Sequence, residues 1–223
     1  MLTEYVLGTF VQELKNRFLC EVDIFGESTV CYVPSSCHLS NFIDLRNKQV
    51  LLVPTNANNS RTKYALFAVP YKRSYILLNI SIANKVVEDN IKNRRFAYLG
   101  KRRHIRKEYK VCGYKSDLFI EDTKTIVEIK GIISKTDCAL FPTVYSERTI
   151  NQMKKLQELM KIGFKVCFCI ISLNPYVKEI DINKGSEFNS ELNKCLNLGM
   201  IVKGYSCKLM EGRLLINKQL PIK

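Results

Sequence analysis

Residues 117–130 have the sequence DLFIEDTKTIVEIK, in which two apolar runs flank the polar tetrapeptide EDTK at 121–124. Four residues is a common length for the connection of a β-hairpin. We therefore predict a hairpin in which Ile120 pairs with Thr125. This hairpin is the starting point for both the predicted fold and the predicted chemistry.

The predicted register places Asp117 opposite Glu128 on the paired strand. Side chains opposed in this way have Cβ atoms about 4.5–5.5 Å apart, and like charges at that separation are destabilising. A divalent cation between the two carboxylates makes this arrangement favourable, because Mg²⁺ takes hard oxygen ligands and commonly one or two protein carboxylates. We predict that Asp117 and Glu128 bind Mg²⁺ or Mn²⁺.

Lys130 lies two residues after Glu128, so both side chains project from the same face of the strand. From there Lys130 would orient the attacking water or neutralise charge on a phosphate. A Lewis-acidic metal, an activated water and a cation beside the phosphate oxygens are the requirements of phosphodiester hydrolysis. Asp117, Glu128 and Lys130 are thus the candidate catalytic residues. The alternative stays open, since an ExK triplet also occurs by chance in exposed strands.

The hairpin belongs to the second part of a chain whose pattern changes near residue 80. Before that point, short apolar runs are separated by Pro, Gly and Asn, which predicts a small all-β module with an OB-like barrel as the candidate fold. The five strands are expected at 17–25, 28–33, 49–53, 63–69 and 75–80. We predict an α+β protein with this module at 1–80.

Residues 81–223 alternate helical and strand-like patterns, which predicts a mixed sheet with helices packed on it. Helices are expected at 81–93, at 149–162 and from Ser186 to Leu198. Gly163 and Gly199 are placed to end the last two. This second domain, a mixed-sheet α/β domain at 81–223, contains the candidate catalytic hairpin.

Composition excludes several classes of protein. The 223 residues are 46% hydrophobic and 25% charged, which is ordinary globular composition and excludes a disordered or low-complexity chain. The longest apolar run has about eight residues, whereas a membrane span needs about 20. The N-terminus has no secretory pattern, and the nine cysteines lie mostly in apolar strand-like runs. These features favour reduced thiols and a soluble cytoplasmic protein.

Positive charge is concentrated in one segment. The chain carries a formal net charge of +14, and residues 92–110 hold nine Lys or Arg against one acid. Clustered like charge costs self-repulsion, which a polyanion relieves through counterion release. A solvated basic loop is the alternative reading. We predict nucleic acid as the partner, DNA rather than RNA, with candidate contacts at Arg17, Arg94, Arg95, Lys101, Arg102, Arg103, Arg106, Lys107, Lys115 and Arg148.

Five fragments occur in an order and spacing that resemble one protein family. They are NRFL at 16–19, N…AN…E from Asn79 to Glu88, D…EIK at 117–130, FP…ER at 141–148 and LPI at 220–222. The chain resembles the sugar fermentation stimulation proteins of bacteria and archaea from about residue 13 onward. The resemblance implies nucleic-acid binding, an OB-like N-terminal domain and a C-terminal domain of the PD-(D/E)xK nuclease type.

The resemblance also implies that Glu88, on the helix before the hairpin, joins Asp117 and Glu128 as a third metal-binding carboxylate. A solvent-facing helix carboxylate is the alternative reading of Glu88. Arg148 is equally open, because it either binds a phosphate or pairs with the neighbouring Glu147.

The chain departs from the family pattern around these residues. Tyr114-Lys115 stand where the family has Ser-Arg, Thr143 replaces an Asp, Thr149 replaces a Gly, and Asn151-Gln152 replace Lys-His. The predicted metal-binding residues are retained while their surroundings are altered. The sequence therefore predicts a metal-dependent DNA or RNA phosphodiesterase of low sequence specificity. The alternative is a non-catalytic, non-specific DNA-binding protein, with a regulatory role open to it, that retains a nuclease fold.

Overall fold

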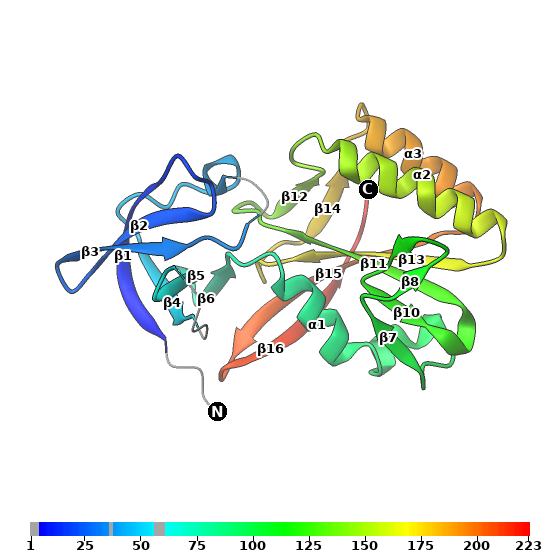
Figure 1. The fold of residues 1–223 in the computed structure, drawn as a ribbon, viewed down its shortest axis with the longest axis horizontal. Coiled ribbons are helices and arrows are strands. Elements are labelled where there is room, and N and C mark those ends of the chain that lie inside the picture. Colours follow the sequence, from blue (N-terminus) through cyan, green and yellow to red (C-terminus); the bar gives the residue numbers. More distant parts are fainter. Residues whose placement is uncertain (1–4, 36–37, 56–60) are drawn as a thin grey trace.

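The computed structural model describes residues 5–35, 38–55 and 61–223. A barrel of short strands lies beside a larger mixed sheet, and two long helices, α2 (Glu147–Lys161) and α3 (Glu187–Asn197), lie together on one face of that sheet (Figure 1). The predicted α+β class is confirmed.

The N-terminal strands close into a five-stranded barrel in the order β1-β2-β3-β5-β4. A parallel bridge between Tyr32 and Ala65 joins β3 to β5 and completes the closure. The sixth strand, β6, extends the sheet from β5 toward the second part of the molecule. The strands are β1 (Val6–Glu13), β2 (Leu19–Ile24), β3 (Glu27–Tyr32), β4 (Gln49–Pro54), β5 (Tyr64–Tyr71) and β6 (Ser74–Leu77).

The sequence did not predict the first of these strands. β1 turns Leu7 and Val11 outward and only Gly8 and Phe10 inward, so its apolar residues do not mark a buried face. The expected strand at 75–80 is also shorter, since β6 ends at Leu77, and it lies outside the five strands that close the barrel.

The second sheet has the order β16-β15-β13-β11-β10-β7. β11, β13 and β15 run parallel in its centre, and β10 and β16 flank them in antiparallel pairings. The elements are α1 (Ile82–Asn90), β7 (Ile105–Lys107), β8 (Lys110–Val111), β9 (Tyr114–Lys115), β10 (Leu118–Ile120), β11 (Thr125–Ile132), β12 (Cys138–Phe141), β13 (Lys165–Ser172), β14 (Glu179–Ile182), β15 (Ile201–Met210) and β16 (Arg213–Leu220), besides α2 and α3.

The predicted hairpin register is confirmed. Ile120 pairs with Thr125 and Leu118 with Val127, and Lys124 adopts the left-handed conformation that completes the turn. Residues of β11 and β13 alternate between the face covered by α2 and α3 and the face covered by α1.

The predicted helix ends are close to those observed. α2 begins two residues earlier than expected, because the Ser146 hydroxyl caps it by accepting from the Thr149 amide. Ser186 caps α3 in the same way through the Asn189 amide. The short strands β12 and β14 and the C-terminal β16 were not predicted.

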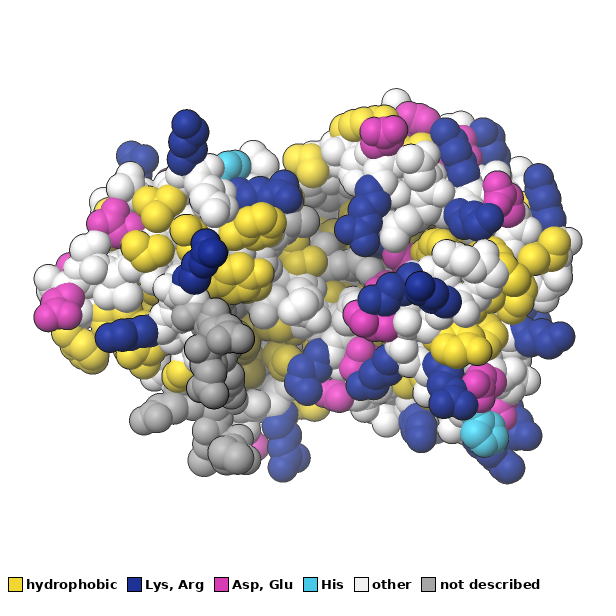
Figure 2. All heavy atoms as spheres, in the orientation of Figure 1, with side chains coloured by type: hydrophobic (Ala, Val, Ile, Leu, Met, Phe, Trp, Pro, Cys, Tyr) yellow, Lys and Arg dark blue, Asp and Glu magenta, His cyan; other side chains and the backbone are white. Residues whose placement is uncertain are grey.

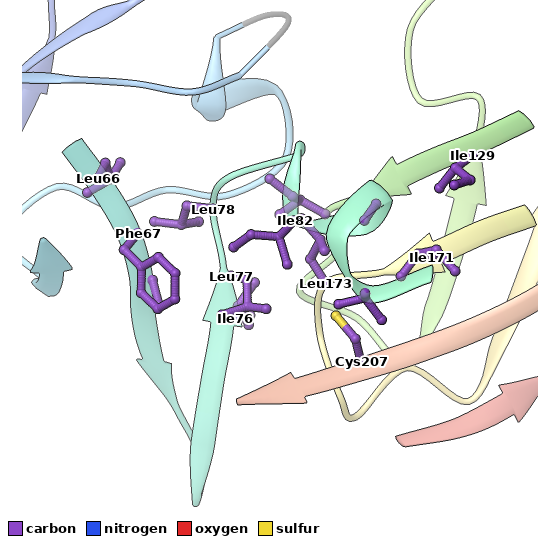
Figure 3. Packing of buried hydrophobic residues seen from close by; sticks show 14 of the residues in the cluster. Leu66, Phe67, Ile76, Leu77, Leu78, Ile82, Ile129, Ile171, Leu173 and Cys207 are labelled. Carbon is purple, nitrogen blue, oxygen red and sulfur yellow. The ribbon is translucent and has the colours of Figure 1, made fainter. Parts of the chain in front are cut away.

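The barrel and the second sheet share one apolar core. The amide of Leu77, at the end of β6, donates to the carbonyl of Leu173, just after β13, at 3.0 Å. Figure 3 shows the buried side chains that run without a break from the barrel strands through β6 to Ile82 of α1 and to β11, β13 and β15. Burial of this surface is the main force that holds the two parts together.

The eight cysteines that lie in the described part of the chain are free thiols, and Cys37 lies outside the described residues. Within the described ranges, every helix is too short or too polar to cross a lipid bilayer.

Gly131 of β11 lies where the segment leading into α1 presses against the sheet. A Cβ at this position would meet the Ile80 carbonyl oxygen at 3.0 Å and the Ala83 Cβ at 3.2 Å. We expect Gly131→Ala to lower the free energy of unfolding by about 1–3 kcal/mol, because neither backbone nor helix can yield easily. Urea denaturation measures this. Gly185→Ala is the matched control, since its Cβ would meet only the Asn183 Oδ1, at 3.8 Å; an equal loss in both variants would contradict the tight packing.

Candidate functional site

A cleft of about 620 Å³ opens between the barrel and the second sheet. The barrel contributes Tyr32 and Phe42 to its lining, the sheet contributes Asp117 and Lys130, and the first turn of α2 contributes Arg148. Figure 2 shows this hollow, with hydrophobic side chains on the barrel side and Lys and Arg side chains on the opposite rim. The predicted catalytic hairpin thus faces a cavity between the two parts of the molecule.

Asp117 lies directly before β10 with both carboxylate oxygens hydrogen-bonded. The Asn84 amide of α1 donates to Oδ1 at 3.1 Å, and the backbone N–H of Ile129 donates to Oδ2 at 2.8 Å. Burial and the adjacent charge of Glu128 raise the pKa of Asp117 to about 6, against the opposing effects of these donors and of Lys130. The carboxylate is therefore charged at neutral pH only at a cost to folding.

Glu128 is 2% exposed and is held by three side chains. The Tyr114 hydroxyl donates to Oε2 at 2.5 Å, while Lys130 Nζ at 2.8 Å and Gln152 Nε2 at 3.1 Å donate to Oε1. Burial and the Glu128 charge raise the pKa of Tyr114 well above its ordinary value, so the phenol remains a proton donor. These contacts offset the cost of burying the carboxylate.

Lys130 extends from β11 between Glu128 and the cleft. Its ammonium group also donates to Gln152 Oε1 at 2.8 Å, and its side chain is 22% exposed. The ammonium is thus fixed by two acceptors while it lines the cavity. An anion in the cleft would meet a cation whose position is already set.

The structure brings Asp117, Glu128 and Lys130 together, whereas Glu88 forms an ion pair with a different residue. Glu88 lies one turn beyond Asn84 on α1, and its carboxylate pairs with Lys107 Nζ at 2.5 Å. Within the described ranges, no three His, Cys, Asp or Glu side chains form a group that could hold a metal. The role of Glu88 as a ligand stays a prediction, and it would require the contact with Lys107 to break.

The basic segment is an ordered part of the fold near the edge strand β7. Five of its predicted contact residues, and Lys115 just after it, are held by intramolecular partners: Arg95 by the Asn217 carbonyl at 3.2 Å, Arg102 by the Ile91 carbonyl at 2.9 Å, Lys101 by Asp122 at 3.7 Å, Arg106 by Glu121 at 2.8 Å, Lys107 by Glu88 at 2.5 Å and Lys115 by Glu108 at 2.9 Å. Lys101, Arg106, Lys107 and Lys115 are thus paired with acids, although their side chains stay exposed.

Two other arginines of the predicted set differ in how they are held. The guanidinium of Arg17 lies 4.7 Å from the centre of the Phe18 ring, on the barrel. Arg148 is exposed and, among the described residues, its side chain has no ion pair and no hydrogen bond, including none to Glu147. Of the predicted nucleic-acid contacts, Arg148 is the one that lines the cleft.

Three residues of this site were not assigned from the sequence: Asn84, Tyr114 and Gln152. Each was noted only as part of a motif comparison, and Tyr114 and Gln152 are two of the positions at which the chain departs from the family pattern. Both contact Glu128, from 14 and 24 residues away in the sequence. The signal that would have found Tyr114 and Gln152 is that both departures from the family pattern concern residues close to the D…EIK motif in the fold.

Asp117→Asn tests how much the charged Asp117 carboxylate lowers the free energy of unfolding. The pKa of Asp117 in the fold is about 6, above its ordinary value of 3.8. The folded protein therefore binds this proton more tightly than the unfolded chain does. At a pH above the folded pKa, the charged carboxylate lowers the free energy of unfolding. We expect Asp117→Asn to stabilise the metal-free protein by up to about 3 kcal/mol near pH 7.5, with the gain vanishing toward about pH 4.

Urea denaturation in a chelating buffer at both pH values measures this effect. Glu158→Gln is the control, since the Glu158 side chain is 63% exposed and should change stability little at either pH. Destabilisation by Asp117→Asn at neutral pH would contradict the expectation.

Tyr114→Phe removes the hydroxyl that donates to Glu128 and leaves the rest of the ring in place. We expect a loss of about 1–3 kcal/mol in the free energy of unfolding, because one oxygen of a buried carboxylate loses its donor. Thermal and urea denaturation measure it. Tyr145→Phe is the matched control because Tyr145 is 73% exposed; indistinguishable effects would show that the contact contributes nothing.

Comparison with known proteins gives a consistent result. Residues 81–213 match the profile described as the sugar fermentation stimulation protein RE domain. The sugar fermentation stimulation protein homolog of Clostridium kluyveri is 26% identical over 217 residues, which cover 93% of this chain and 92% of the relative. The homolog of Clostridium acetobutylicum is 26% identical over 222 residues, with coverage of 97% and 96%.

The fold also has a solved counterpart. The structure of SfsA from Pyrococcus furiosus, determined in complex with Ca²⁺, superposes with a TM-score of 0.86 at 18% sequence identity and covers 99% of this chain and 96% of that one. The profile match extends over more than half of the sequence and contains the whole hairpin of β10 and β11. The chain belongs to the sugar fermentation stimulation protein family.

Proposed function

We propose that this protein binds nucleic acid and hydrolyses phosphodiester bonds in a divalent-metal-dependent reaction of low sequence specificity. The observation that carries the proposal is the pairing of two acids, Asp117 and the buried Glu128, beside Lys130, with Asp117 and Lys130 in the wall of a cleft. Membership of the sugar fermentation stimulation protein family supports a role connected with nucleic acid.

The donor set suits a hard divalent cation. Burial, and after it the charge of Glu128, raise the pKa of Asp117, and Mg²⁺ or Mn²⁺ held by one or two carboxylates would stabilise the charged form of both acids. Glu88 is proposed as a third ligand after release from Lys107. The Pyrococcus furiosus relative was solved as a Ca²⁺ complex, which supports a divalent cation in this fold. When bound, such a cation supplies Lewis acidity toward a phosphate.

The cationic side chains have separate roles in this proposal. Lys130 is fixed by Glu128 and Gln152, so its ammonium group can neutralise charge on a phosphate oxygen without reorganising. Arg148 lines the cleft, has no side-chain hydrogen bond or ion pair within the described part of the chain, and would bind a neighbouring phosphate through paired N–H donors.

The arrangement supports a catalytic domain of the PD-(D/E)xK type in residues 81–223, with the acid of the first hairpin strand followed by the ExK triplet of the second. The barrel in residues 1–80 is proposed as an OB-like module. Contacts to phosphates carry no sequence information, so Arg17, Arg94 and Arg103 would add affinity without specificity.

One observation favours a second function. Both oxygens of Glu128 already accept hydrogen bonds, from Tyr114, Lys130 and Gln152, and the carboxylate is almost inaccessible. A ligand position closed in this way is what a non-catalytic DNA-binding protein with a retained nuclease fold would have. Binding alone does not separate the two functions, since both require it.

Cleavage separates them. Labelled single- and double-stranded DNA and RNA would be incubated with the protein in Mg²⁺, in Mn²⁺ and in chelator. We expect metal-dependent cutting that Asp117→Asn and Glu128→Gln each reduce by at least about a hundredfold, because each substitution removes a charged ligand.

Glu158→Gln, on the exposed side of α2, is the control and should cut like the parent protein. Binding without cutting in any metal, by protein that retains its fold, would overturn the enzymatic proposal and leave the DNA-binding one. The absence of both binding and cutting would overturn both.

A further inference from the structure

The cleft has two chemically different walls. On the side of the second sheet lie the carboxylate of Asp117, the ammonium of Lys130 and the guanidinium of Arg148. On the barrel side lie the aromatic rings of Tyr32 and Phe42. The phosphate chemistry of the proposed function uses the first wall only and gives no role to the second.

The backbone of Tyr32 is held by strand pairing on both sides, although the residue is exposed. It is the last residue of β3 and pairs with Leu19 of β2 on one side and Ala65 of β5 on the other. Its side chain is nevertheless 40% exposed. An exposed aromatic ring that lines a cavity, carried by a backbone paired on both sides, is a surface on which a planar group can stack.

We propose that the cleft takes an unpaired nucleotide, with its base against Tyr32 and its phosphate toward Lys130 and Arg148. This inference rests on the proposed function and names its substrate class: single-stranded nucleic acid, or a strand locally opened at an end or a lesion. An aromatic wall opposite a cationic wall matches the two halves of a nucleotide, since bases stack on side-chain rings and phosphates bind Lys and Arg.

An intact duplex does not offer this combination. Its base faces are covered by neighbouring pairs, and only the base edges are accessible in the grooves. To reach a stacking ring inside a cavity, a base has to leave the duplex, which costs least where the strand is already unpaired. Because every base has a flat aromatic face, stacking on Tyr32 also agrees with low sequence specificity.

A binding measurement with matched oligonucleotides tests the stacking. Three fluorescein-labelled probes of about 12 nucleotides would be compared by anisotropy in a chelating buffer, so that nothing is cut: oligothymidylate, a duplex of the same length, and an abasic strand with the same phosphates. We expect the parent protein to bind oligothymidylate tighter than the other two probes.

Variants of Tyr32 locate the effect. Tyr32→Ala should weaken oligothymidylate binding about tenfold and change abasic-strand binding less than about twofold, whereas Tyr32→Phe, which keeps the ring, should bind like the parent. Phe25→Ala is the matched control, because Phe25 is a 93% exposed aromatic residue of the barrel that does not line the cleft. It should leave the affinity for all three probes unchanged.

The outcomes distinguish this inference from the proposed function. If Tyr32→Ala, checked by its melting temperature to be folded, weakens both strands equally or not at all, the stacking site is wrong, while binding and metal-dependent cutting remain as tested above. Equal affinity for duplex and single strand in the parent protein would also overturn it. If no probe binds at all, the proposed function itself fails.

Discussion

The burial of the Glu128 carboxylate beside the half-buried carboxylate of Asp117 is the constraint on which the centre of this molecule depends. Asp117 and Glu128 are fixed side by side by the pairing of β10 with β11, and the fold offsets their charges with donors drawn from several elements. Asn84 comes from α1, Tyr114 from β9 and Gln152 from α2. The acids thus tie together parts of the chain that share no strand pairing, and their neighbouring charges make a divalent cation a favourable addition.

The cleft exists because the barrel and the mixed sheet are joined firmly along one side. The hydrogen bond from Leu77 to Leu173, the close approach of Gly131 to Ile80, and the continuous apolar core leave little freedom between the two parts. A cavity bounded by two such units keeps its shape without a ligand. Preformed geometry of this kind lowers the entropic cost of positioning a flexible strand.

Local patterns predicted local structure well. The polar EDTK turn between alternating runs set the hairpin register, and Ser186 with Gly199 marked the ends of α3. β1 was missed because its apolar side chains, Leu7 and Val11, face outward and conceal the buried side of the strand. The partners of Glu128 were missed because they come from distant parts of the chain, and such contacts follow from tertiary packing rather than from any periodicity. For the same reason the ion pairs that Lys101, Arg106 and Lys107 of the segment 92–110 form with distant acids could not be predicted.

The turn of the central hairpin has a second attachment. The Asp122 carboxylate accepts hydrogen bonds from the backbone amides of Arg103 and His104, at 2.7 and 2.8 Å. These hydrogen bonds, of which the one from His104 has the larger effect, hold the pKa of Asp122 below its ordinary range. The arginine-bearing loop is therefore anchored to the ribbon whose other end holds the two acids. A force that a bound polymer exerts on this loop would therefore be transmitted along the hairpin to Asp117 and Glu128. Binding at the loop and the relative position of the two acids are mechanically coupled in this way.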